Sequence, residues 1–143
     1  MKKLRAVLAY VNGSSTDESV IELACDTAKR ARARAHVIYV IQVNRALPLT
    51  AEIQPEMDKG EKVLEAAEQI AESFGQPIET EILQAREVGP AVVDEAVERN
   101  CDLIILGVPF QKRVGNFDIG TTADYVLKSS PARVWLVRGP MGE

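Results

Sequence analysis

Two segments of the sequence carry the glycine and hydroxyl residues that phosphate-binding loops use. One is residues 12–14 (Asn-Gly-Ser), and the other starts at Gly107 and ends at residues 120–122 (Gly-Thr-Thr). Glycine lets backbone N–H groups approach an anion closely, and a helix that starts at Thr121 adds the positive end of its dipole. Residues 121–124 (Thr-Thr-Ala-Asp) also fit a capping box, which needs no ligand. The segment therefore predicts either a phosphate site or a self-capped helix.

The sequence gives little support for other nucleotide-binding motifs, for a catalytic histidine or for a metal site. The Gly-x-x-x-x-Gly-Lys-Ser/Thr and Gly-x-Gly-x-x-Gly patterns are absent, and the single histidine, His36, begins a strand away from both loops. Asp102 stands at the amino end of a strand, where α/β folds do not place their sites. Asp118 and Asp124 flank the last helix start, where they either hold Mg²⁺ through water or cap the helix. We therefore expect no dedicated enzyme and no metal centre made by the protein alone.

Strands and helices alternate along the chain and must position the two loops. Apolar or alternating runs predict strands at residues 6–11, 37–43, 78–83, 102–107 and 133–138. Residues 15–18 (Ser-Thr-Asp-Glu) predict a capping box, followed by a helix whose apolar stripe reaches Ala35. Further helices are predicted at residues 56–74, from residues 89–90, and from residues 120–121 to about Ser130, with Gly75 stopping the longest of them.

Alternation of strands and helices predicts a parallel sheet with right-handed crossovers. The first and fourth strands are apolar throughout and should be central, whereas the third alternates and the fifth is bracketed by Arg133 and Arg138, as edge strands are. The predicted fold is α/β: a single open five-stranded parallel sheet, order 3-2-1-4-5, with helices on both faces, Rossmann-like. One domain spans residues 1–143. This order brings both loops to the switch point between strands 1 and 4.

Composition limits the partners and the compartment. The 143 residues are 46% hydrophobic and 27% charged with a net charge of −4, so the chain is globular and a poor match for nucleic acid. The chain has no apolar segment of about 20 residues, so we expect no membrane insertion and a cytoplasmic location. Cys25 and Cys101 are predicted to be buried free thiols. A basic cluster at residues 29–34 is either an anion site or a solvated helix face.

The two loops and the end of the chain resemble one known family. Residues 11–14 (Val-Asn-Gly-Ser), residues 107–110 (Gly-Val-Pro-Phe) followed after nine residues by Gly-Thr, and the final Ser-Pro and valine-rich strand are similar to universal stress proteins. The resemblance implies the same strand order, a homodimer through residues 133–138, and bound ATP or AMP, with Mg²⁺ as a companion of the phosphates. It implies adenine and ribose near the first loop and Val40, and phosphates near Gly107, Gly120 and Thr121. The candidate nucleotide-binding residues are Asn12, Gly13, Val40, Gly107, Phe110, Gly120, Thr121 and Thr122.

Two departures from the family pattern leave the function open. Asn12 replaces an acidic residue, which exchanges a carboxylate for one acceptor and one donor group, and Phe110 replaces a glycine. The first hypothesis is an adenine-nucleotide-binding module that regulates a stress response through dimer or partner contacts. The alternative is a family member that does not bind ATP and acts as a dimeric protein-interaction module, with a transporter as one candidate partner. Slow nucleotide hydrolysis is a side activity at most.

Overall fold

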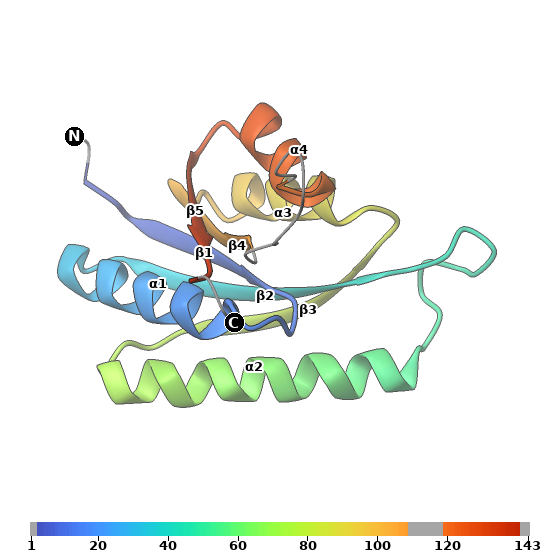
Figure 1. Cartoon of the computed structure of the whole chain (residues 1–143), viewed down its shortest axis with the longest axis horizontal. Coiled ribbons are helices and arrows are strands. Elements are labelled where there is room, and N and C mark those ends of the chain that lie inside the picture. Colours follow the sequence, from blue (N-terminus) through green and yellow to red (C-terminus); the bar gives the residue numbers. More distant parts are fainter. Residues whose placement is uncertain (1–2, 109–118, 141–143) are drawn as a thin grey trace.

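The computed structural model describes residues 3–108 and 119–140, in which strands and helices alternate (Figure 1). None of the described helices is both long and apolar enough to cross a membrane. The elements are β1 (Ala6–Val11), α1 (Asp17–Ala31), β2 (Arg34–Gln42), α2 (Gln54–Phe74), β3 (Glu79–Ala85), α3 (Val88–Glu98), β4 (Leu103–Val108), α4 (Thr121–Ser129) and β5 (Arg133–Arg138).

All strand pairings in the sheet are parallel, and the strand order is β3-β2-β1-β4-β5. The predicted fold class and order are therefore confirmed. β1 and β4 are central and almost wholly buried, whereas β3 and β5 are edges whose residues are half-buried or exposed. The order in which the chain adds strands reverses between β1 and β4. The loops that follow these two strands therefore lie side by side at the carboxyl ends of the strands.

Each face of the sheet is covered by its own pair of helices (Figure 1). α1 and α2 pack on one face around a core that includes Val7, Ile105 and Ala67. α3 and α4 pack on the other face around Leu8, Leu106 and Val126. Successive strand residues point to opposite faces, so an uninterrupted apolar strand is the sequence pattern that two covered faces require.

Helix α1 ends earlier than its apolar stripe indicates. Arg32 adopts the left-handed conformation with φ 56°, and its N–H donates back to the helix carbonyls. The N–H of Arg34 then donates to the carbonyl oxygen of Arg5 at 2.9 Å, which starts β2. Ala35 therefore lies in β2, and its assignment to the helix was wrong. A left-handed residue without glycine gives no clear stop signal in a sequence.

The two cysteines are free and buried, as predicted. Burial raises the pKa of Cys25 and raises that of Cys101 to about 11. Both thiols therefore stay protonated at neutral pH, where the thiolate is the reactive form. The two residues act as small apolar side chains in the core.

The single histidine lies beneath an ion-pair cluster near the start of the sheet. His36 is 4% exposed, and its Nδ1 lies 3.2 Å from Nη1 of Arg99 and 3.5 Å from a carboxylate oxygen of Glu79. Its Nε2 has no hydrogen-bond partner among the residues that the structure describes. Burial, followed by the charge of Arg99, lowers the pKa of His36, and the carboxylates of Glu79 and Glu95 oppose this shift.

This environment predicts that acid destabilises the protein through His36. Below the ordinary pKa of 6.5, His36 takes up a proton in the unfolded chain but resists protonation in the folded protein. The free energy of unfolding therefore decreases as the pH is lowered. The fall reaches at most about 1.4 kcal/mol for each pH unit. Urea unfolding between pH 7.5 and 5 should show a shallower pH dependence for His36→Leu than for the unmodified chain. Equal slopes would contradict this assignment.

Candidate functional site

The loop after β1 is held in place by the first residue of α1. The carboxylate of Asp17 accepts the backbone N–H groups of Asn12 at 3.2 Å and Gly13 at 2.7 Å, and the side-chain oxygen of Asn12 accepts the N–H of Ser14 at 3.1 Å. The helix begins after Thr16 without a side-chain capping bond. The capping box predicted at residues 15–18 was therefore wrong, because Asp17 binds the preceding loop.

Burial changes the acidity of the side chains around this loop. It raises the pKa of Asp17, although two backbone N–H groups and the charge of Lys59 work in the opposite direction. Burial, followed by the charge of Asp17, raises the pKa of Tyr10 to about 12, against the effect of its hydrogen bond with Asn12. Tyr10 thus remains a neutral hydroxyl at physiological pH and can donate a hydrogen bond.

Gly107, at the end of β4, is required for the packing of α1 against the sheet. A Cβ atom at this position would clash with the hydroxyl of Thr16 and would lie 2.8 Å from its Cβ and 3.2 Å from Cγ2 of Val20. Thr16 is almost fully buried and its hydroxyl pairs with that of Ser14 at 2.8 Å. The lack of a side chain at Gly107 therefore allows the start of α1 to pack closely against β4.

Helix α4 begins at Thr121, and no side chain of residues 119–124 caps its amino end. Its N-cap is Gly120, with φ 87° and ψ 161°, and no side-chain capping bond forms. Asp124 pairs instead with Lys128 at 3.0 Å, one turn further along. The self-capped reading of residues 121–124 was therefore wrong. The first N–H groups of a helix have no acceptor within the helix, so the amino end of α4 suits an anion.

The carboxyl ends of β1 and β4 and the start of α4 enclose one cavity of about 280 Å³. A second cavity of about 280 Å³ shares two threonines of α4 and continues toward Gln42, Glu87 and Tyr125. Five of the eight candidate residues line the first cavity, together with Tyr10: these are Asn12, Gly107, Gly120, Thr121 and Thr122. The wall thus combines backbone N–H groups, hydroxyls and one amide, a set of donors suited to a phosphate or sugar oxygen.

The remaining candidates lie elsewhere. Gly13 lines a separate groove of about 420 Å³ between α1 and α2, where a Cβ would lie 3.0 Å from Cε of Lys59. Val40 is buried in the core beneath α3 and α4. Phe110 lies outside the described residues, as does Asp118.

Sequence reasoning missed two residues of the site. Tyr10 lies within an apolar strand, where its ring is a normal core residue and its hydroxyl carries no separate signal. Glu87 comes directly before α3, so only the tertiary fold brings it beside the start of α4. The described residues contain no group of three or more histidine, cysteine, aspartate or glutamate side chains able to hold a metal.

Comparisons with known proteins agree on one family. Residues 3–138 match the model of the universal stress protein family. Universal stress protein MJ0531 of Methanocaldococcus jannaschii is 26% identical over 97% of this chain and 85% of its own length.

Solved structures of the same family share the fold at lower identity. A universal stress protein in complex with cAMP is 19% identical, covers 96% of this chain and 98% of its own, and superposes with a TM-score of 0.75. The universal stress protein from Archaeoglobus fulgidus in complex with dAMP is also 19% identical and has the same TM-score, over 96% of this chain and 99% of its own.

Proposed function

The chain belongs to the universal stress protein family, and from this premise we propose that it binds an adenine nucleotide, AMP or ATP, between β1, β4 and α4. Two solved relatives carry cAMP and dAMP, which are also adenine nucleotides. The observation that supports the proposal most is the cavity at the amino end of α4, which five of the candidate residues line. The nucleotide acts through occupancy of the site and not through turnover.

Each group of residues has a separate part in this proposal. The N–H groups and hydroxyls of Thr121 and Thr122 receive a phosphate at the start of α4, where the helix dipole favours negative charge. Asn12 offers an amide to the ribose or base, and the Asp17 carboxylate fixes the loop that presents it. Tyr10, kept neutral by its raised pKa, donates from the cavity wall. Mg²⁺ accompanies the phosphates of ATP.

The same proposal includes a homodimer through β5. Among the strands that the structure describes, β5 is the last in the sheet order and pairs with β4, and its residues between Arg133 and Arg138 are half-buried. Leu127 on the neighbouring helix is 47% exposed. An edge strand with such side chains is a ready surface for pairing with a second copy. The start of α4 lines the cavity, and the end of α4 leads into β5. A nucleotide that repositions α4 would therefore also affect the dimer contact.

Nucleotide binding should stabilise the protein against heat. A ligand at one hundred times its Kd adds about 2.7 kcal/mol, or roughly 8 °C in Tm for a domain of this size. Gly120→Val should abolish most of this shift, because the positive φ of Gly120 strains any other residue and displaces the first N–H groups of α4. Differential scanning fluorimetry with AMP, and with ATP plus Mg²⁺, measures both effects.

Gly75 provides the matched control. It also flanks a helix and has φ 66°, but it follows α2 and lines neither cavity of the site. Gly75→Val should lower Tm by a similar amount yet keep the nucleotide shift. A full shift in Gly120→Val would exclude the proposed phosphate position. The absence of a shift with every adenine nucleotide would favour the alternative, a dimeric interaction module of the same family.

A further inference from the structure

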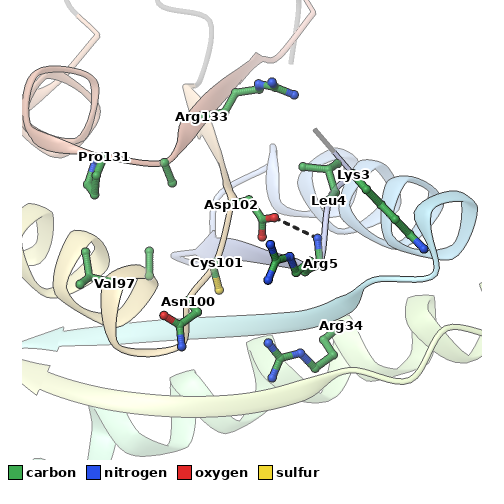
Figure 2. Close-up of a pocket in the computed structure, with 12 residues that line it drawn as sticks. Lys3, Leu4, Arg5, Arg34, Val97, Asn100, Cys101, Asp102, Pro131 and Arg133 are labelled. Carbon is green, nitrogen blue, oxygen red and sulfur yellow. Dashed lines mark hydrogen bonds between the residues drawn. The ribbon is translucent and has the colours of Figure 1, made fainter. Parts of the chain in front are cut away.

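A further cavity lies at the amino ends of the strands, opposite the nucleotide crevice at their carboxyl ends. It is an open basin of about 730 Å³ across the amino ends of the strands (Figure 2). Four basic side chains line it, from Lys3, Arg5, Arg34 and Arg133, together with one carboxylate, Asp102. The basin thus concentrates positive charge on a chain whose net charge is −4.

Backbone hydrogen bonds place these residues in one row across four neighbouring strands. The N–H of Arg34 donates to the carbonyl oxygen of Arg5 at 2.9 Å, and the N–H of Arg133 donates to that of Asp102 at 3.1 Å. The N–H of Asp102 donates to Ala6, which links the two halves of the row. Arg34 pairs in register with Ala6, the residue that follows Arg5, on a strand about 4.8 Å away. Both arginines line the same basin, so we expect one small anion to contact both.

Several arginines elsewhere in the described chain have partners, whereas two of the arginines at the basin, Arg5 and Arg34, have none among the described residues. Arg30, Arg86 and Arg99 each donate to a carboxylate or a carbonyl oxygen. Within residues 3–108 and 119–140, the side chains of Arg5 and Arg34, like that of Lys3, form none of the observed hydrogen bonds or salt bridges. Unpaired cations that share one hollow repel one another, and a bound anion removes that repulsion.

Asp102, the one carboxylate among the described residues that line the basin, forms no ion pair with Lys3, Arg5 or Arg34. The two oxygens of Asp102 accept the backbone N–H groups of Arg5 at 3.0 Å and Ala6 at 3.1 Å, and thereby fix the start of β1. Figure 2 shows this carboxylate turned toward the backbone of Arg5. Asp102, which sequence reasoning placed at the wrong end of a strand for a site, is therefore a structural part of the basin wall.

We propose that this basin is a second ligand site, which takes a small oligophosphate anion. The guanidinium fork of arginine matches the oxygens of phosphate in a bidentate way, and a chain of phosphates carries several charges in a small volume. The cavity volume lies within the range of small-molecule sites. Buried Leu4, Ala96 and Cys101 form its apolar floor, which excludes water from one side of the ligand. This inference does not depend on the proposed nucleotide site.

Titration calorimetry with inorganic tripolyphosphate tests the proposal on the whole chain. The double variant Arg5→Gln/Arg34→Gln should bind the probe at least tenfold more weakly than the unmodified chain. The matched control, Arg30→Gln/Arg32→Gln, removes the same charge from the end of α1, at the same edge of the sheet, and should change affinity less than twofold. In a Gly120→Val background, which disables the nucleotide crevice, the loss of affinity caused by Arg5→Gln/Arg34→Gln should persist.

Amide chemical shifts provide a second measurement that needs no variant. On titration with tripolyphosphate, the largest shifts should occur at residues 3–5, 34, 100–102 and 133. Shifts centred on residues 120–123, or binding lost in Gly120→Val, would place the probe in the nucleotide crevice and overturn the proposal. Equal losses in the two double variants, or the absence of binding to the unmodified chain, would overturn it as well.

Discussion

Replacing Gly107 with alanine should lower the free energy of unfolding by about 3 kcal/mol, the upper part of the range for overpacked cores. The new Cβ would clash with the hydroxyl of Thr16 and would lie 2.8 Å from its Cβ. Because Thr16 is 2% exposed and bonded to Ser14, it has no room to move away. α1 or β4 must shift instead. Urea denaturation monitored by circular dichroism measures the loss.

A second substitution shows whether the clash is the cause. Thr16→Gly removes the atoms that the new side chain meets, so Gly107→Ala should cost much less in that background than in the unmodified chain. Val20 Cγ2, at 3.2 Å, would remain as a milder contact. If the two substitutions were simply additive, the role assigned to Gly107 in the packing of α1 would be wrong.

Replacing Arg99 with methionine should cost about 2 to 3 kcal/mol, since hydrogen bonds to charged groups contribute about 1.5 to 3 kcal/mol each and this site is partly solvent-screened. Nε of Arg99 donates to Glu95 at 2.8 Å, and its two terminal nitrogens reach Glu79 and Glu81 on β3. The variant leaves three carboxylates close together without a cation. Urea denaturation at pH 7.5 in low salt measures the effect.

The control for this prediction is Arg30→Met. Arg30 pairs with Asp26 one turn away in α1, but the two side chains are 80% and 47% exposed. Such exposed pairs contribute about 0.3 to 0.5 kcal/mol. Equal losses for Arg30→Met and Arg99→Met would mean that the cluster on β3 and α3 adds nothing beyond an ordinary surface pair.

The strand order could be predicted because each strand's composition reports how many of its faces are covered. The wholly apolar β1 and β4 are central, and the alternating β3 is an edge. Helix ends were predicted where glycine marks them, as at Gly75, and were missed where Arg32 takes the left-handed conformation without glycine. Local signals therefore suffice when the residue type itself forces the geometry.

The hydrogen bonds of the site were harder to predict than the fold, because several of its side chains have both local and distant groups as possible partners. Residues 15–18 and 121–124 both fit a capping box, yet Asp17 binds the loop behind it and Asp124 pairs with Lys128. Gly107 lines the crevice, as expected, but the sequence did not indicate that Thr16 from another element fills the space of its missing side chain. Such choices depend on packing between elements that are far apart in the sequence, which a motif does not encode.

The surroundings of His36 also limit the proton chemistry open to this fold. A guanidinium can only donate, so the contact of Arg99 with Nδ1 uses the ring's lone pair and places the imidazole hydrogen on Nε2, within the core. A general base needs a free lone pair that substrate or solvent can reach. In this arrangement the chain's only imidazole offers neither solvent nor a bound ligand a free lone pair.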